Sequence, residues 1–295
     1  MGSLQLLMAV WVRHKQTATH VIMSLRKYLE ILTAQKRPVR FLASRLICRL
    51  GLARLFQIRC DGFRLRLHPA SISMRLWVEG ADRNEDLDLL KKVLRQGDTY
   101  IDVGANIGQL CLAASVAVGT QGRVFAFEPH PNTYRFLCDN LQANRSQNIV
   151  AVQAAIGEDA GFSKISDGPS DDQNRIGDSG PTIVRLKLED LFPGISVRLL
   201  KIDVEGFEQA VLLGCGGLLD RVETIYCEIY DKNTQRYGYT GASLIELLNS
   251  RGFKVFRVEG ATLTKVTEQD SFAVCRNLLA CRDACSLGRH FTVVV

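Results

Sequence analysis

The stretch 99–108 reads Thr-Tyr-Ile-Asp-Val-Gly-Ala-Asn-Ile-Gly and is followed by an apolar run at 110–118. Its first residues favour a β-strand, glycines follow, and the apolar run suits a helix. A strand that turns through glycines into a helix presents backbone N–H groups and the positive end of the helix dipole. Gly104 permits the sharp turn, and we expect Gly108 to let a ligand approach the backbone. The stretch therefore predicts a strand–loop–helix unit of an α/β fold with a ligand-binding loop.

The spacing of this loop differs from that of a dinucleotide site. It is Asp-x-Gly-x-Asn-x-Gly rather than Gly-x-Gly-x-x-Gly, in which pyrophosphate lies on the turn and no anion is expected beside it. A carboxylate that leads into the loop favours a positively charged ligand. S-adenosylmethionine has a sulfonium group, an ammonium group and no phosphate. We expect its methionine end to be held by Asp102, Gly104, Asn106 and Gly108. An ordinary turn with incidental glycines is the alternative.

Strands and helices alternate after this unit, which is the pattern of a parallel sheet with right-handed crossovers. The strands expected first are 99–103, 123–128, 149–156, 199–203 and 224–228, and 253–258 and 271–275 are expected to close the sheet as an antiparallel pair. The helices expected between or after them are 106–119, 131–144, 206–214 and 241–251. We expect residues 71–80 to be irregular, residues 163–181 to form a mobile loop and residues 183–188 to form an edge strand.

The N-terminal part of the chain differs in charge from the rest. Residues 1–68 contain 13 basic and two acidic residues, a net charge of +11, whereas the whole chain carries +6, so the remainder carries −5. We expect a basic helical extension at 1–56 and one domain at 57–295, with a hairpin at 57–68 and a sheet core at 98–276. The basic extension could contact a membrane, a nucleic acid or an acidic partner. Solvated helix faces are the alternative.

Cysteine content and targeting signals indicate a cytoplasmic protein. The nine cysteines are an odd number and are scattered through predicted strands and helices, which favours reduced thiols over disulfides. The apolar stretch 4–12 is too short to span a bilayer, and no signal-peptide pattern surrounds it. Nucleic acid is not expected as a substrate, because the basic residues lie on the extension rather than among aromatics near the predicted site. Peripheral membrane contact through residues 1–56 stays open.

An acid ends the second predicted strand. Glu128 lies 24 residues beyond Gly104 and is followed by Pro129. An acid at this distance commonly meets a ribose diol, because a carboxylate accepts from both hydroxyl groups. Glu128 therefore supports nucleoside binding without choosing between S-adenosylmethionine and NAD.

Two more strand ends carry acids. Asp203 follows a buried run, Glu205 is two residues on, and Glu228 ends the neighbouring strand. Ligands of open α/β sheets bind at this edge, and like charges held close raise the pKa of one carboxyl, which favours a general base. A divalent metal held by these three carboxylates is an alternative, but we assign no metal. Glu208 is expected to favour the start of the next helix.

Three motifs together resemble the FkbM family of S-adenosylmethionine-dependent methyltransferases. They are Asp102–Gly108, Phe127-Glu-Pro129 and Leu200–Gly206, and the resemblance covers about residues 57–276. It implies a Rossmann-like class I methyltransferase fold, with a seven-stranded, mostly parallel sheet and helices on both faces. It also implies S-adenosyl-L-methionine as cofactor and O-methylation of a hydroxyl on a sugar or polyketide-type small molecule. The turn 154–157, with Ala155, is expected to border the adenine.

One departure from the family affects the catalytic assignment. Many members carry a histidine two residues after the acid of the fifth strand, where this chain has Tyr230. We expect Asp203 to accept the proton of the acceptor hydroxyl, with Glu228 and Tyr230 as the other candidates. An NAD-dependent oxidoreductase and a non-catalytic, membrane-associated cofactor-binding protein remain as alternatives. The loop spacing and Asp102 argue against the first, and the retention of both Asp203 and Glu228 argues against the second.

Overall fold

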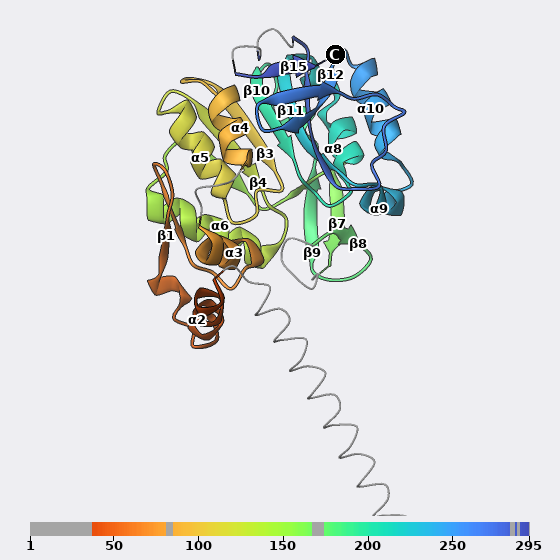
Figure 1. Cartoon of the computed structure of the whole chain (residues 1–295). Helices are drawn as coiled ribbons and strands as arrows, with labels where there is room; N and C mark the ends of the chain where they lie inside the picture. Colours follow the sequence, from red (N-terminus) through yellow and green to blue (C-terminus); the bar gives the residue numbers. More distant parts are fainter. Residues whose placement is uncertain (1–36, 81–84, 167–173, 284–286, 288–289, 295) are drawn as a thin grey trace, which may run out of the picture.

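The structure, a computed structural model, describes residues 37–80, 85–166, 174–283, 287 and 290–294. Its centre is a nine-stranded sheet with the order β15-β13-β12-β14-β11-β10-β3-β4-β5. The strands are β3 Thr99–Val103, β4 Arg123–Phe127, β5 Ile149–Val152, β10 Val197–Ile202, β11 Val222–Ile229, β12 Lys254–Glu259, β13 Thr262–Lys265, β14 Arg276–Cys281 and β15 Thr292–Val294. Helices cover both faces of this sheet (Figure 1).

Seven neighbouring strands, from β5 to β12, form the arrangement that the alternating pattern predicts. β5, β4, β3, β10 and β11 are parallel neighbours, and β14 lies antiparallel between β11 and β12. The predicted α/β class with a mostly parallel central sheet is confirmed. The total exceeds the seven strands that the resemblance implied, because β13 and β15 extend the sheet beyond β12.

The two faces of the sheet pack against different helices. Alternate residues of a strand point to opposite faces, so Tyr100 and Leu199 join one core while Ile101 and Leu200 join the other. The first core includes α4, α5 and α6, and the second includes α8 and α10. These helices are α4 Glu85–Val93, α5 Gln109–Val118, α6 Pro131–Asn144, α8 Glu208–Cys215 and α10 Gly241–Ser250. Figure 1 shows α4 and α5 on the left of the sheet and α8 and α10 on the right.

The predicted strand 149–156 is wrong in its second half. β5 ends at Val152, and the chain then leaves the large sheet and enters a separate four-stranded sheet with the order β6-β9-β7-β8. Its strands are β6 Ala155–Ile156, β7 Gly161–Ile165, β8 Ile176–Gly177 and β9 Thr182–Leu186. β9 pairs with β6 on one side and with β7 on the other, so it is not the edge strand expected at 183–188. The small sheet also takes up both ends of the loop expected at 163–181.

The predicted strand 271–275 is also wrong. Only Phe272 is buried in that segment, whereas Leu278, Leu279, Ala280 and Cys281 of β14 are buried. This apolar run pairs with β11 and β12 at once, which places it inside the sheet. The sheet core therefore extends past residue 276, to Val294.

The hairpin predicted at 57–68 is confirmed, with β1 at Gln57–Arg59 and β2 at Arg64–Arg66. The segment expected to be irregular is helix α3, Ser71–Glu79. No side chain caps its start, so the sequence lacks a start signal, and Leu76 instead packs against the hairpin cluster of Ile58, Phe63 and Leu65.

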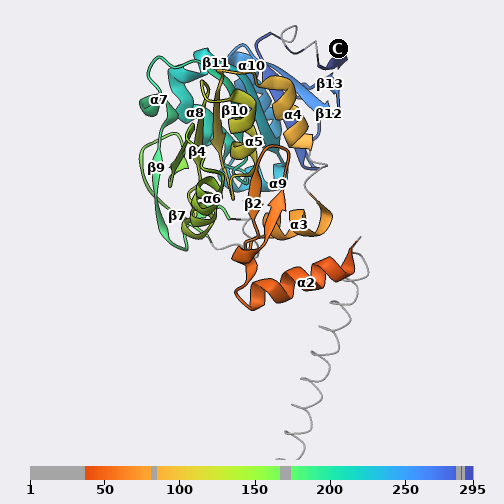
Figure 2. The same cartoon turned by 90° about the vertical axis from the view of Figure 1, so that its left-hand side faces the viewer.

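Two helical segments precede the hairpin. They are α2 Pro38–Arg49 and the 3₁₀ turn η1 Ala53–Leu55, and they confirm helix in the later part of the extension. Residues 1–36 lie outside the described residues. Within the described part of the chain, no helix combines the length and the apolar character required to cross a bilayer. Both views show α2 at one end of the molecule, beyond α3 (Figures 1 and 2).

We predict that His68 makes the fold sensitive to acid. Its side chain is fully buried and stacks on Phe136 with the ring centroids 4.4 Å apart. Burial lowers the pKa of His68 to about 4 from 6.5. The unfolded chain therefore binds a proton that the folded protein does not bind, and stability falls as the pH drops below the unfolded value. We expect this residue alone to lower the free energy of unfolding by about 2 kcal/mol between about pH 7.5 and about pH 5.

Urea denaturation at a series of pH values measures this loss. The variant His68→Leu should show a flatter pH dependence in this range, while His290→Leu, at an exposed position, should keep that of the wild type. An unchanged pH dependence in His68→Leu would contradict the prediction.

Candidate active site

A cavity of about 670 Å³ opens at the carboxyl ends of β3, β4, β10 and β11. This volume is within the range of small-molecule and cofactor sites, about 300–1,000 Å³. The structure brings nearly all of the predicted site residues to its wall: Asp102, Gly104, Asn106, Glu128, Ala155, Asp203, Glu228 and Tyr230. Gly108 is the exception. A Cβ on Gly108 would lie 2.5 Å from Leu137 Cδ1, so this glycine permits close packing of α6 rather than approach of a ligand.

The loop after β3 depends on glycine at its first turn. Gly104 has a φ of +84°, and a Cβ there would lie 1.9 Å from the backbone oxygen of Asp203. Asn106 also has a left-handed φ of +48°, and its Oδ1 accepts a hydrogen bond from the N–H of Ile107 at 2.8 Å. The loop therefore lies directly against the end of β10, which only a residue without a side chain permits at position 104.

A buried ion pair joins the two strands beside this loop. Lys201 of β10 is the register partner of Asp102 in β3, and its Nζ lies 3.1 Å from Asp102 Oδ1 and 3.4 Å from Asp203 Oδ2. The same Nζ donates to the backbone oxygen of Gly104 at 3.1 Å. Burial by itself would lower the pKa of Lys201, but the charges of Asp102 and Asp203 outweigh it and hold this pKa above its ordinary value. Lys201 therefore stays charged.

Lys201 was missing from the predicted site. The only signal in the sequence is a lysine within an apolar run, between Leu200 and Ile202. The side chain of Asp102 is fully buried, and its Oδ2 accepts from Cys111 Sγ at 3.1 Å. Its charge is thus balanced inside the protein by Lys201.

Glu128 at the end of β4 holds the loop from the other side. Its Oε2 accepts from the N–H of Asn106 and its Oε1 from the N–H of His130, each at 2.9 Å. Burial raises the pKa of Glu128 to about 7, although both N–H donors and the more distant Lys201 lower it. The Glu128 carboxyl therefore changes its protonation state near neutral pH.

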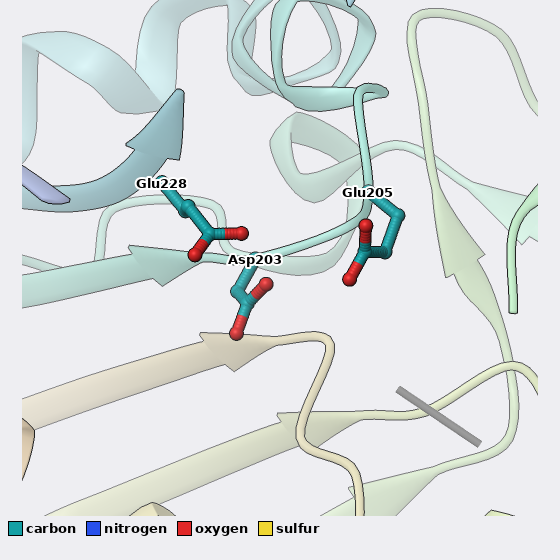
Figure 3. Close-up of side chains that lie close together, drawn as sticks. All are labelled: Asp203, Glu205 and Glu228. Atoms are coloured by element: carbon teal, nitrogen blue, oxygen red, sulfur yellow. The ribbon is translucent and has the colours of Figure 1, made fainter. Parts of the chain in front are cut away.

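Three carboxylates from two neighbouring strand ends meet on the cavity wall. Asp203, Glu205 and Glu228 each place one oxygen within 4.8 Å of the others (Figure 3). The extended geometry that would put Asp203 and Glu205 on one face does not continue past β10. Glu205 has a left-handed φ of +56° instead, and its Oε2 accepts from Asn233 Nδ2 at 2.9 Å. This turn directs the carboxylate back towards Asp203.

The carboxylate cluster has the electrostatics of a proton acceptor. Burial raises the pKa of Glu228, and the neighbouring charge of Asp203 raises it further. Tyr230 lines the same cavity two residues on. Three oxygens at this spacing could share a proton or bind a hard divalent cation. Glu208, in contrast, is a structural residue, because its carboxylate accepts from the N–H of Gly206 and from the hydroxyl of Tyr239 at the start of α8.

The outer wall of the cavity carries exposed cations that the sequence did not reveal. They come from α3, the segment before β8, the short helix α9 Asp231–Thr234 and the turn η4 Gln235–Tyr237. The residues are Arg75, Arg175, Lys232 and Arg236. They come from three separate parts of the chain, with Lys232 and Arg236 four residues apart, and only the fold brings these parts together.

Comparisons with known proteins find methyltransferases. The model of the family described as "Methyltransferase FkbM domain" matches residues 102–255. Hexuronic acid methyltransferase AglP of Haloferax volcanii is 28% identical over 178 residues, which are 58% of this chain and 72% of that protein. Methyltransferase FkbM from Methylobacillus flagellatus KT aligns over 82% of this chain and 59% of that chain, with 13% identity and a TM-score of 0.42. A putative rRNA-methylase from Clostridium thermocellum aligns over 68% of this chain and 97% of that chain, with 14% identity and a TM-score of 0.43.

We predict that Lys201→Met destabilises the protein strongly. The substitution leaves Asp102 buried without its cation, and breaking a buried pair in this way costs about 3–5 kcal/mol. Urea denaturation measures the free energy of unfolding. Lys164→Met, at an exposed position of β7, is the matched control and should change stability little. The double variant Lys201→Met with Asp102→Asn should recover part of the loss, and a Lys201→Met variant as stable as the control would contradict the role of the pair.

Proposed function

The chain belongs to the FkbM family of methyltransferases and uses S-adenosylmethionine as methyl donor, and we propose that it methylates a hydroxyl group of a sugar-type small molecule. The observation that carries this proposal is the meeting of a glycine loop, the acid that follows β4 and a pair of strand-end carboxylates at one cavity. Membership of this methyltransferase family argues against the alternative of an NAD-dependent oxidoreductase. The close approach of Asp203 and Glu228 supports catalysis rather than cofactor binding alone.

The residues of the cavity fit the cofactor. Each oxygen of Glu128 accepts one backbone N–H bond and keeps acceptor capacity for a hydroxyl group, which suits a ribose diol. The loop Gly104–Asn106 borders the same space and would hold the methionine end. Ala155 would border the adenine. Asp203 and Glu205 supply negative charge on a wall that would face a cation.

For methyl transfer, the protein has to position the acceptor hydroxyl and remove one proton from it. Bound S-adenosylmethionine supplies a methyl group that is already activated on a sulfonium. Asp203, with its side chain about half exposed on the cavity wall, would accept the proton of the acceptor hydroxyl. Glu228 would share this proton. The buried Lys201 holds the Asp203 carboxylate in place through their ion pair. General-base help of this kind contributes about 10²–10⁴-fold in rate.

An acidic sugar suits the outer wall of the cavity. Arg75, Arg175, Lys232 and Arg236 are exposed and place positive charge along the lining of the cavity. The relative named as a hexuronic acid methyltransferase supports a carboxylate-bearing sugar as acceptor. We therefore favour a uronic acid or a similarly charged sugar over a neutral polyketide-type molecule.

Methyl transfer from labelled S-adenosylmethionine to a panel of uronic acids, neutral sugars and polyketide alcohols tests this function. We expect transfer to the uronic acids and a loss of about 10²–10⁴-fold in kcat for Asp203→Asn. Cofactor affinity should change little in that variant. Removing the charge of Asp203 should also lower the pKa of Glu228, so the acid limb of the residual rate should move to lower pH. The control Asp190→Asn lies at an exposed position of the short helix α7 Leu188–Leu191, outside the cavity. Full turnover in Asp203→Asn would remove it as the base.

Cofactor affinity should depend on the protonation of Glu128. The pKa of Glu128 is about 7, and only the carboxylate can accept from two ribose hydroxyls. Calorimetry with S-adenosylhomocysteine should therefore show about tenfold weaker binding at pH 6 than at pH 8. Glu128→Gln should bind weakly at both pH values, whereas Glu246→Gln on the exposed side of α10 should behave as the wild type. A Glu128→Gln variant with wild-type affinity would show that Glu128 does not bind the ribose.

A further inference from the structure

Helix α2 exposes an apolar stripe on its outer side. Val39, Leu42, Leu46 and Leu50 recur at three- and four-residue spacing, which places them on one face of the helix. All four are exposed, and Leu46 is 58% exposed. The turn that follows adds two more exposed leucines, Leu52 and Leu55. A helix that packs on a domain normally turns its apolar face inward, so this exposed stripe calls for a partner.

The inner side of α2 is already occupied. Phe41 and Ser44 are buried, and Cys48 Sγ donates to the backbone oxygen of His68 at 4.0 Å. Phe41 and Cys48 are seven residues apart, which is nearly two helical turns, so they share one face of the helix with Ser44. That face lies about opposite the stripe. The orientation of α2 is therefore fixed by the domain beneath it, and its apolar stripe faces away from that domain.

Arginines flank the stripe. Arg40, Arg45 and Arg49 are exposed, and no acid lies between Glu30 and Asp61. Among the residues described, none of these three arginines forms an ion pair. Arg45 also lies over the Phe41 ring, with its Cζ 5.1 Å from the ring centroid. An apolar stripe bordered by exposed arginines is the arrangement of a helix that lies in the interface of an anionic bilayer.

We propose that the outer face of α2 and η1, defined here as the docking face, binds an anionic lipid surface. Its leucines enter the boundary between headgroups and acyl chains, and its arginines contact lipid phosphates. Nucleic acid would use the arginines but not the leucine stripe. Residues 1–36 do not complement its charge, since they hold five basic residues and one acidic residue.

The docking face lies close to the entrance of the cavity. α2 packs against α3, and Ile72 and Arg75 of α3 line the cavity wall. Helices α2 and α3, each about 10 Å in diameter, therefore lie between the lipid surface and the cavity. Both views place α2 and α3 at the same end of the molecule (Figures 1 and 2). Resting on the proposed function, this placement implies an acceptor hydroxyl that is presented at a membrane surface.

Flotation of the full-length protein with vesicles tests the docking face. The wild type should float with vesicles of phosphatidylcholine and phosphatidylglycerol and not with phosphatidylcholine alone. The stripe variant Leu42→Ser with Leu46→Ser and the charge variant Arg40→Glu with Arg49→Glu should each lower vesicle binding by about tenfold or more. Phe162→Ser on β7 and Arg123→Glu at the start of β4 are matched controls at exposed positions. Both controls should bind vesicles as the wild type does.

Affinity for S-adenosylhomocysteine, measured on every variant, reports folding and the cofactor site separately from lipid binding. Absence of wild-type binding to anionic vesicles would overturn the docking face. Vesicle binding by both docking-face variants at the level of the wild type would also overturn it and would assign lipid contact to residues 1–36. A comparable loss in the controls would overturn it too. Failure of methyl transfer with intact flotation would instead remove the proposed function and leave the docking face in place.

Discussion

The site depends on the ion pairs that the buried ammonium group of Lys201 forms. This group binds Asp102 of β3, Asp203 after β10 and the backbone oxygen of Gly104. An isolated charge in this position would cost several kcal/mol of desolvation, so the lysine requires carboxylate partners and the buried Asp102 requires the lysine. One cation thus fixes the glycine loop after β3 and the proposed base relative to each other. Methyl transfer to an acceptor oxygen requires that these two parts hold a fixed position relative to each other.

The sequence was sufficient for the parts of the fold that local patterns specify. The strand–loop–helix unit at 99–118 and the acids at strand ends followed from periodicity, from glycine and from the rule that parallel strands end at one edge. The wrong assignments lie where tertiary pairing decides. The break after Val152 depends on β9, the position of β14 depends on two neighbours, and α3 depends on the hairpin beneath it.

The site shows the same division between local and tertiary causes. Asp203 and Glu228 could be predicted because each ends a strand. The position of Glu205 could not, because it follows from a left-handed turn and from Asn233, which is 28 residues away. Lys201 was hidden for a related reason. A lysine in an apolar run gives no sign of its partner until the strand register places Asp102 beside it.

The distribution of charge in the cavity matches two different reactants. Glu128, the half-exposed Asp203 and Glu228 place acids on its wall, and three exposed arginines and an exposed lysine line the same cavity. Under the proposed function, the carboxylates would favour a cationic methyl donor, and the exposed cations would favour an anionic acceptor. The arginines of α2 would extend the outer positive field towards a lipid surface, so that an acidic acceptor at a membrane would meet the same charge from first contact to the entrance.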